Sequence, residues 1–374
     1  MNPLSEYLAQ LASLEVNVWR EGDNLRCSGP SVAITDEIRT GLAARKPDLL
    51  RFLERAQSPI EREFDSRLAW KGADLPSDAG VIPLTPACSV ELDALLERLR
   101  ESSPPLETLH PDDFDLSACR AVLAKAKEQL DQGLGFAVID RLDLSVMSSE
   151  EARSVYWLLA SMLERPVPLR WDGTVMRDVS DLGKRSMRAV DTTAGMDYHT
   201  DNSFNVCPPH YVSLLCLQKA KEGGVSKLVS FPAVHNEMRR RHPGLLARLY
   251  GPYRFNRQAE HAPDAEVTLS RPIFENVEGE LATRMSRFHV RTGHALSGKP
   301  LDSEGETAME AMEAIMNEPG TGFEFWFEPG QIQVIDNRRI GHKRTEFSDW
   351  PEPERKRCLV RLWLRDSGRP RYNG

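Results

Sequence analysis

The sequence predicts an α+β chain in which a small module of helices and a hairpin precedes a larger domain of short strands and flanking helices. In the first 57 residues, a helical period of apolar side chains changes to strict alternation and then returns to a helical period. After residue 195, short apolar runs are separated by turn residues such as Gly223 and Gly224, which is typical of strands. Short strands with helices at the flank favour a β-sandwich or a jelly roll.

The composition excludes several classes of protein. The 374 residues suffice for one large and one small domain. The net charge of −8 argues against a partner of nucleic acid or anionic membrane, since such binding needs excess Lys and Arg. The chain has no apolar run of about 18 residues and its first ten residues do not resemble a secretory signal, so we expect no membrane association and a cytoplasmic location.

The six cysteines contribute little to this classification. They are scattered, and none forms a C-x-x-C pair with another. In a chain of this length we expect free, partly buried thiols rather than a disulfide or zinc framework. The cysteines are Cys27, Cys88, Cys119, Cys207, Cys216 and Cys358.

Residues 1–57 predict the order helix, two strands, helix, helix. Apolar positions four and three apart predict a helix over 3–14, and alternation on both sides of "REGDN" predicts a hairpin. Thr35 is a suitable N-cap for the next helix. Pro47 ends that helix and can open another.

The next residues, 58–85, are polar, contain prolines and lack a sustained period, so we expect a linker there. The large domain then covers 86–374. Its expected elements include a strand over 136–139, a helix with Ser148 as N-cap, a helix within 302–320, and strands in "HYVSLLCLQ", "SKLVSFP", "FEFWFEPGQIQVIDN" and "KRCLVRLWLRD".

The pattern His-x-Asp occurs twice, at His199 and Asp201 and again at His110 and Asp112. In an extended segment, side chains two apart project to the same side, so either pair could bind a metal. Two histidines and one carboxylate on one face of an octahedron are the ligands of many iron(II) oxygenases. The apolar run "GQIQVIDNRRIGH" supplies His342 as a second histidine.

Two arginines lie on the otherwise apolar C-terminal strand. Arg357 and Arg361 are four apart, so both can point into one cavity. A guanidinium binds a carboxylate strongly through two parallel hydrogen bonds, which suits a dicarboxylate cosubstrate. Internal salt bridges to Asp or Glu would explain the same two residues equally well.

Residues from about 130 to 370 resemble the taurine/α-ketoglutarate dioxygenase (TauD/TfdA) family of Fe(II)- and 2-oxoglutarate-dependent oxygenases. The resemblance rests, in this order, on "YHTDNSF", "PPHYVSLLCLQKAKEGGVSKLVSFPAVHNEM", "FEPGQIQVIDNRRIGHKRTEF" and "ERKRCLVRLWLRD". It implies a double-stranded β-helix (jelly-roll) core, and Fe(II), 2-oxoglutarate and O₂ as cofactor and cosubstrates.

The resemblance also implies roles for individual residues. His199, Asp201 and His342 would be the iron ligands. Arg361, helped by the hydroxyl of Ser226, would bind the distal carboxylate of 2-oxoglutarate, and Arg357 would lie near its C1 carboxylate. His110 and Asp112 precede the matching region, so we expect the two aspartates of "HPDD" to be first-turn or cap residues of the following helix.

Residues 1 to about 57 resemble the tubulysin-type (TubC-type) N-terminal β-hairpin docking domain of nonribosomal peptide and polyketide assembly lines. The matching stretches are "LSEYLAQLASLEVNVW", "GDNLRCSGP" and "ITDEIRTGLAARKPDLLRFL". The resemblance implies an αββαα domain whose partner is a short linear motif at the C-terminus of another subunit. An exposed hairpin edge can pair with such an extended peptide.

The two resemblances together imply an enzyme that hydroxylates an acyl, aminoacyl or peptidyl group held on a carrier protein. Related halogenases have a small residue in place of the carboxylate, so Asp201 favours hydroxylation or desaturation over halogenation. The alternatives are action on a free amino acid or small molecule, a non-catalytic adaptor, and a zinc hydrolase. The candidate segments at the mouth of the active site are 172–198 and 271–293. In the second segment, Arg284, Arg287 and Arg291 are either ligands of a phosphate or carboxylate, or paired surface charges.

Overall fold

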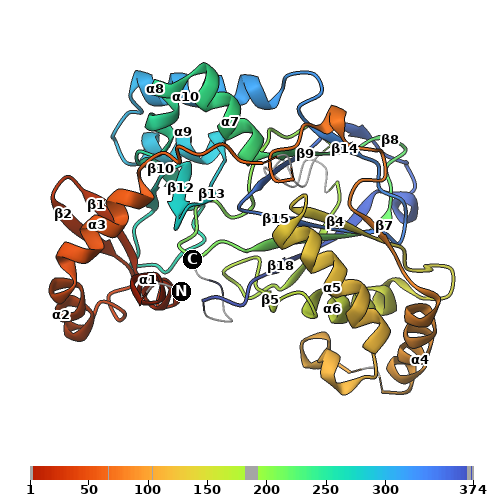
Figure 1. Ribbon diagram of the computed structural model, residues 1–374. Helices are drawn as coiled ribbons and strands as arrows, with labels where there is room; N and C mark the ends of the chain where they lie inside the picture. Colours follow the sequence, from red (N-terminus) through yellow and green to blue (C-terminus); the bar gives the residue numbers. More distant parts are fainter. Residues whose placement is uncertain (1–2, 66, 103, 182–192, 369–371, 373–374) are drawn as a thin grey trace.

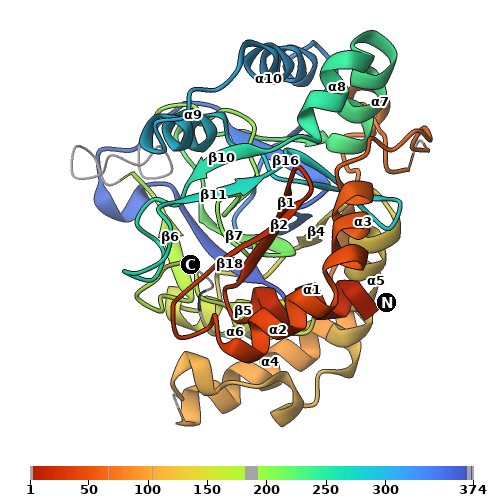
Figure 2. The same cartoon turned by 90° about the vertical axis from the view of Figure 1, so that its left-hand side faces the viewer.

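The computed structural model describes residues 3–65, 67–102, 104–181, 193–368 and 372, which form a mixed α+β structure (Figures 1 and 2). The N-terminal module lies beside the larger body of sheets and helices (Figure 1). Its elements follow the predicted order: α1 (Pro3–Ser13), β1 (Asn17–Glu21), β2 (Asn24–Ser28), α2 (Asp36–Ala44) and α3 (Lys46–Ala56).

Local side-chain chemistry explains where the helices of the N-terminal module begin. Thr35 accepts a hydrogen bond from the backbone of Ile38 as the N-cap of α2, and Pro47 lies in the first turn of α3, both as predicted. In the hairpin, Val18 pairs with Cys27. The buried side chains of this module form a small core: Leu11, Val16, Val18, Leu42, Leu49 and Leu53.

A seven-stranded sheet is the centre of the larger body. Its order is β3 (Val81–Pro83), β4 (Phe136–Asp140), β15 (Ile332–Asp336), β7 (Tyr211–Gln218), β18 (Cys358–Leu364) and β5 (Pro166–Val167), with β6 (Met176–Val179) also paired to β18. The pairing of β3 with β4 is parallel and the other pairings are antiparallel. Along β18, Val360 and Leu362 face the helices, whereas Leu359 and Trp363 face the opposite side.

A second, three-stranded antiparallel sheet lies against that opposite side. Its order is β14 (Phe323–Phe325), β9 (Ser226–Ser230) and β16 (Ile340–Arg344). Buried side chains of both sheets pack in one cluster, which includes Leu228, Phe323, Val212 and Trp363. The candidate site described below lies between these two sheets.

Helices cover the outer faces of both sheets. The first group packs on the seven-stranded sheet: α4 (Pro86–Ser102), α5 (Ser117–Gln132) and α6 (Ser149–Ser161). The second group forms another apolar cluster at the far end of the body (Figure 2): α7 (Phe231–Arg241), α8 (Pro243–Leu249), α9 (Arg287–Leu296) and α10 (Ser303–Met316). The N-cap role predicted for Ser148 is confirmed by a full capping box with Glu151.

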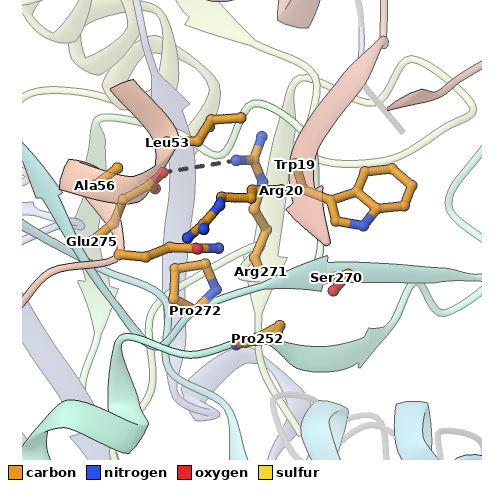
Figure 3. A pocket seen from close by; sticks show the side chains of 10 residues that line it. Trp19, Arg20, Leu53, Ala56, Pro252, Ser270, Arg271, Pro272 and Glu275 are labelled. Atoms are coloured by element: carbon orange, nitrogen blue, oxygen red, sulfur yellow. Dashed lines mark ion pairs between the residues drawn. The ribbon is translucent and has the colours of Figure 1, made fainter. Parts of the chain in front are cut away.

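Three two-stranded ribbons complete the described structure: β8 (Glu222–Gly223) with β17 (Phe347–Ser348), β10 (Tyr253–Asn256) with β11 (Thr268–Arg271), and β12 (Phe274–Val277) with β13 (Glu280–Thr283). The N-terminal module contacts two of them. Ser31 donates two hydrogen bonds to Asp264, at 2.9 and 2.7 Å, and Ser5 donates one to Glu278. Figure 3 shows a groove at this junction, where Trp19 and Arg20 of β1 face β11.

The segment expected to be a linker, 58–85, is packed against the larger body. Ile60, Phe64 and Trp70 are each at most 4% exposed, and Trp70 donates its indole N–H to the carbonyl of Leu134. The end of the segment forms β3 of the large sheet. The segment is mostly polar and rich in proline, so its few buried apolar residues did not stand out in the sequence. The domain boundaries themselves stay a prediction.

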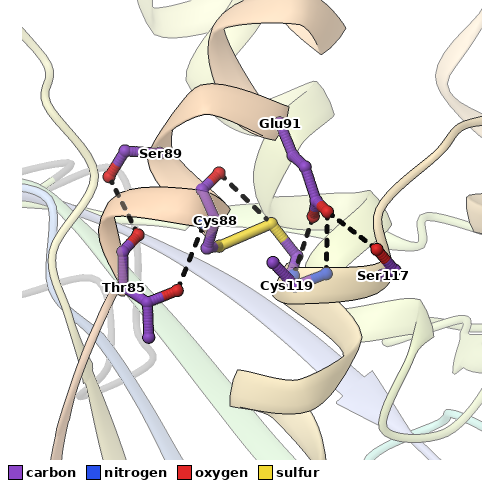
Figure 4. The surroundings of a disulfide bond; sticks show 7 residues. Thr85, Cys88, Ser89, Glu91, Ser117 and Cys119 are labelled. Carbon is purple, nitrogen blue, oxygen red and sulfur yellow. Dashed lines mark hydrogen bonds between the residues drawn. A yellow bond between two sulfur atoms is a disulfide. The ribbon is translucent and has the colours of Figure 1, made fainter.

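The prediction of free cysteines is wrong for Cys88 and Cys119, which form a disulfide (Figure 4). Both lie near the first turns of α4 and α5, whose N-terminal ends meet, so tertiary packing rather than sequence spacing brings them together. The other four cysteines are free thiols, as predicted. Among the helices of the described residues, none is long and apolar enough to span a membrane.

Candidate metal and cosubstrate site

Two histidines from segments far apart in the chain lie side by side between the sheets. His199 and His342 form an isolated antiparallel bridge, with backbone N–O distances of 3.1 and 3.0 Å. Their ring centroids are 4.3 Å apart. His342 lies on β16, whereas His199 lies in a loop that adds to the edge of the same strand. This backbone pairing holds the two imidazoles side by side.

Asp201 completes the cluster. Its Oδ1 lies 3.5 Å from Nε2 of His199 and 3.5 Å from Nε2 of His342. Two ligand atoms about 2.1 Å from one ion, at a right angle, would be about 3.0 Å apart, so small movements would suffice to bind a metal. Among the described residues, these three form the one group of His, Cys, Asp and Glu side chains with such proximity.

The surroundings of the cluster favour metal binding. Nδ1 of His199 lies 2.9 Å from the carbonyl of Asp197, which directs the lone pair of Nε2 toward the cluster. Burial lowers the pKa of His342, which favours the neutral form of this imidazole. Burial alone would raise the pKa of Asp201, but the charge of Arg361 and the two histidine contacts hold it well below the usual range. Neutral imidazoles and an ionised carboxylate are the forms that bind a metal.

The other oxygen of Asp201 is engaged elsewhere. Its Oδ2 accepts hydrogen bonds from the indole Nε1 of Trp363, at 2.7 Å, and from Nη1 of Arg361, at 3.0 Å. The backbone of Asp201 is held by the amide of Asn337, which accepts at 2.8 Å and donates at 2.9 Å. Oδ1 is therefore the oxygen that faces the histidines.

A cavity extends from the histidines along β18. Arg357, Arg361 and Ser226 line it together with both histidines, which confirms that the two arginines face one cavity. Much of its wall is apolar and comes from the seven-stranded sheet and the adjoining loops. These apolar residues are Val179, Met196, Val212, Leu214, Phe327 and Leu359.

Arg357 is a buried cation that lines this cavity. It is 4% exposed, and among the described residues no carboxylate forms an ion pair with its guanidinium. Burial lowers its pKa, which reflects the cost of a charge in this environment. Its Nε lies close to Gly224, two residues before Ser226. An anionic ligand in the cavity would compensate this charge.

The structure places the two arginines differently from the sequence expectation. Arg361 contacts Asp201 and so lies at the metal end, whereas Arg357 lies beside the segment that carries Ser226. Ser226 is buried and donates its hydroxyl to Oε1 of Gln333 at 3.1 Å. Strand alternation predicts which side of a strand a residue faces, but not how far along the cavity it lies.

The second His-x-Asp sequence has none of these features. His110 is exposed, and Asp112 pairs with Arg120 on the surface. The capping role expected for its aspartates is wrong. Helix α5 begins at Ser117, and Glu91 of α4 accepts hydrogen bonds from the backbone of its first turn (Figure 4).

The candidate mouth arginines have partners within the chain. Arg287 pairs with Glu306, Glu310 and Glu313, and Arg291 pairs with Glu306. Arg284 instead donates to the carbonyls of the loop that follows Asp201: Ser203, Asn205 and Val206. The interpretation of Arg287 and Arg291 as paired surface charges is confirmed. Much of the other candidate segment, 172–198, lies outside the described residues.

The sequence interpretation missed Trp363 and Asn337. Trp363 lies two residues after Arg361 on β18, so the two side chains face the same side of the strand. The argument that predicted two arginines in the cavity could therefore have included the indole. Asn337 directly follows β15, and only the tertiary structure shows that it binds the backbone of Asp201.

Two protein-family models match the chain. Residues 99–363 match "Taurine catabolism dioxygenase TauD, TfdA family", and residues 4–55 match "TubC N-terminal docking domain". Among known proteins, the FR-33289 synthase of Streptomyces rubellomurinus (strain ATCC 31215) is 24% identical over 315 residues, which cover 82% of this chain and 91% of that protein. The taurine hydroxylase-like protein SAT17 of Stachybotrys chartarum (strain CBS 109288 / IBT 7711) is 25% identical, over 80% of this chain and 79% of that one.

Solved structures share the fold. Asparagine oxygenase, in complex with Fe(II), 2S,3S-3-hydroxyasparagine and succinate, is 18% identical with a TM-score of 0.57. The non-heme iron oxygenase OrfP, in complex with Fe and α-ketoglutaric acid, is 16% identical with a TM-score of 0.57. Each comparison covers 77% of this chain and 94% of the solved chain.

Proposed function

The chain belongs to the taurine catabolism dioxygenase TauD, TfdA family and is an Fe(II)- and 2-oxoglutarate-dependent dioxygenase, and from this premise we propose that it hydroxylates a carrier-bound group on an assembly line. The site assignment rests on one cavity that contains both the His/Asp/His cluster and the buried Arg357, which forms no ion pair with a described carboxylate. The two-sheet arrangement around it would be a double-stranded β-helix. We place the enzyme in the cytoplasm, as the sequence led us to expect.

His199, Asp201 and His342 would hold the iron, with Asp201 binding through Oδ1. Bound iron with 2-oxoglutarate and O₂ supplies an oxidant able to attack an unactivated C–H bond. Arg357 and Ser226 would bind the distal carboxylate of 2-oxoglutarate, because this pair lies away from the metal end. Arg361 would meet an anionic group nearer the metal, either the C1 carboxylate or part of the substrate.

The apolar wall between these polar groups would position the substrate and keep water from the reacting carbon. Its residues come from the seven-stranded sheet and from the loops that carry Met196 and Phe327, so most of the wall is built on a rigid frame. A frame of this kind would hold the substrate in a fixed orientation. The chain's contribution to catalysis is therefore orientation and exclusion of water.

The N-terminal module supports a carrier-bound substrate. Residues 4–55 match a docking domain, and we propose that this hairpin module binds the C-terminal linear motif of another assembly-line subunit. Docking would raise the local concentration of the carrier protein without adding contacts at the active site. The hydrogen bonds of Ser5 and Ser31 to the body would fix the direction from which the carrier arrives.

A free amino acid or small molecule from the same pathway is the alternative substrate. The solved structures of asparagine oxygenase and OrfP contain hydroxylated free amino acids, which motivates this second candidate. Desaturation of either kind of substrate would use the same iron site. The docking module would then only anchor the enzyme to the assembly line.

Intact-protein mass spectrometry separates these possibilities. Candidate acyl-carrier proteins, loaded with aminoacyl or acyl groups, are incubated with the enzyme, Fe(II), 2-oxoglutarate and O₂. A gain of one oxygen on the carrier would support hydroxylation of a tethered group, and a loss of two hydrogens would indicate desaturation. If free amino acids were oxidised and no loaded carrier changed mass, the proposed substrate class would be wrong.

A further inference from the structure

Two donors from one strand share the outer oxygen of Asp201. Nε1 of Trp363 lies 2.7 Å from Oδ2, and Nη1 of Arg361 lies 3.0 Å from the same atom. We propose that Trp363 is a positioning residue that keeps Asp201 a one-oxygen metal ligand. This inference rests on the proposed function, because it assigns a role to Trp363 within the same iron site.

The two donors differ in how firmly they are held. Trp363 is 5% exposed and belongs to the apolar cluster between the two sheets, where Phe136 and Val212 also pack. An indole N–H can only donate, so no alternative assignment of its atoms exists. Its hydrogen bond to Oδ2 is therefore fixed by packing as well as by polarity.

Arg361 is the exchangeable donor. It lines the cavity, and its buried Nε has no hydrogen-bond partner among the described residues, so a donor remains for a second anion. An anionic cosubstrate or substrate would compete with Asp201 for this guanidinium. When Arg361 turns toward such a ligand, Trp363 still holds Oδ2.

The consequence concerns the number of open coordination positions. Two histidines and one carboxylate oxygen leave three positions for cosubstrate and O₂. A carboxylate that bound through both oxygens would occupy one of them. Hydrogen bonds to the outer oxygen of a ligand carboxylate orient the inner oxygen, and loss of such contacts commonly weakens metal binding by about 10- to 100-fold.

Titration with Co(II), followed by visible absorption, tests this role without turnover. The Trp363→Phe variant keeps the aromatic packing and removes only the N–H group. It is expected to bind Co(II) roughly 10- to 100-fold more weakly, with a less intense visible spectrum, because Oδ2 is then held by the exchangeable Arg361 alone and can turn toward the metal. Trp70→Phe is the matched control, since it removes another buried indole hydrogen bond, to the Leu134 carbonyl at 2.8 Å, in the same apolar cluster.

A second variant keeps the test decisive if Trp363→Phe folds poorly. Arg361→Met retains the indole bond and removes a neighbouring positive charge, so it should bind Co(II) at least as tightly as the wild type, with an unchanged spectrum. The inference is overturned if Trp363→Phe matches Trp70→Phe in affinity and spectrum, or if Arg361→Met alone changes the spectrum. If neither the wild type nor Trp70→Phe binds Co(II), the proposed metal site itself is wrong and the inference falls with it.

Discussion

The guanidinium of Arg361 lies 3.0 Å from Oδ2 of Asp201, whereas Arg357, four residues earlier on the same side of the chain, forms no ion pair with any described carboxylate. This relationship separates the roles of two arginines that look equivalent in the sequence. Arg361 belongs to the metal end of the cavity. Arg357 is the buried cation for which a distal carboxylate would be the counter-ion.

Replacement of Arg357 by Met should weaken binding of 2-oxoglutarate. Loss of a buried, charge-assisted pair costs about 2–3 kcal/mol, which corresponds to roughly a 30- to 150-fold higher Kd. Anaerobic titration of the Fe(II)-loaded protein with 2-oxoglutarate measures this Kd. The control is Arg240→Met, which removes an exposed arginine. A larger loss of affinity in Arg361→Met than in Arg357→Met would restore the assignment expected from the sequence.

Removal of residues 1–57 should separate docking from chemistry. The cut leaves Ile60 and Phe64, which are buried in the larger body, so the remaining chain should fold and bind 2-oxoglutarate as before. Oxidation of a carrier-bound substrate at micromolar concentration should fall by roughly 10- to 100-fold, because docking raises the local concentration. Mass spectrometry of the carrier measures the rate. An unchanged rate on the carrier would contradict the docking role.

The stability of the protein should decrease in mild acid because of His235. Burial is the main cause that lowers its pKa from 6.5 to about 4, with help from the charges of Arg239 and Arg62. Below pH 6.5 the unfolded chain binds a proton that the folded chain does not, so the free energy of unfolding falls until about pH 4. The loss should reach about 3 kcal/mol at most.

Urea unfolding at pH 7 and at pH 4.5 measures this loss. The His235→Gln variant cannot titrate, but its amide can still contact the hydroxyl of Tyr250, which lies 2.9 Å from Nε2 of His235. Its stability should depend less on pH than that of the wild type. Equal pH dependence in the two proteins would rule out His235 as the responsible group.

The Cys88–Cys119 disulfide should be detectable and stabilising. It closes a loop with a sequence separation of 31 residues, for which the chain-entropy model gives about 3–4 kcal/mol. Cys88→Ser should lower the free energy of unfolding by an amount of this order, and Cys27→Ser, which removes a free thiol, should not. Alkylation before and after reduction, followed by mass measurement, counts the thiols. Six accessible thiols in the unreduced, unfolded protein would refute the disulfide.

Much of the fold was predictable because local chemistry and tertiary packing agree. Thr35, Pro47 and Ser148 end or begin helices as their side chains require. The pairing of His199 with His342 is different, since an edge bridge between distant segments leaves no periodic pattern in the sequence. Only the motif resemblance brought those two residues together before the structure did.

The rest of the site depends on how far along the cavity each side chain lies and on which residues it contacts. Strand alternation encodes neither. Periodicity indicated that Arg357 and Arg361 share a side of the strand, but not which of them reaches Asp201. Similarly, sequence spacing did not predict the Cys88–Cys119 disulfide or the packing of segment 58–85 against the larger body. A polar segment can still pack through Phe64 and Trp70.

The most direct test of the site uses the chain's own pair of His-x-Asp sequences. His199→Ala removes a proposed iron ligand, and His110→Ala removes the equivalent residue of the exposed sequence that lies outside the cavity. Each protein is loaded with Fe(II) without oxygen, 2-oxoglutarate is added, and the visible charge-transfer absorption is recorded. The wild type and His110→Ala should develop the same weak band, and His199→Ala and His342→Ala should develop none. A band of equal strength in His199→Ala and the wild type would contradict the assignment of iron and 2-oxoglutarate to this site.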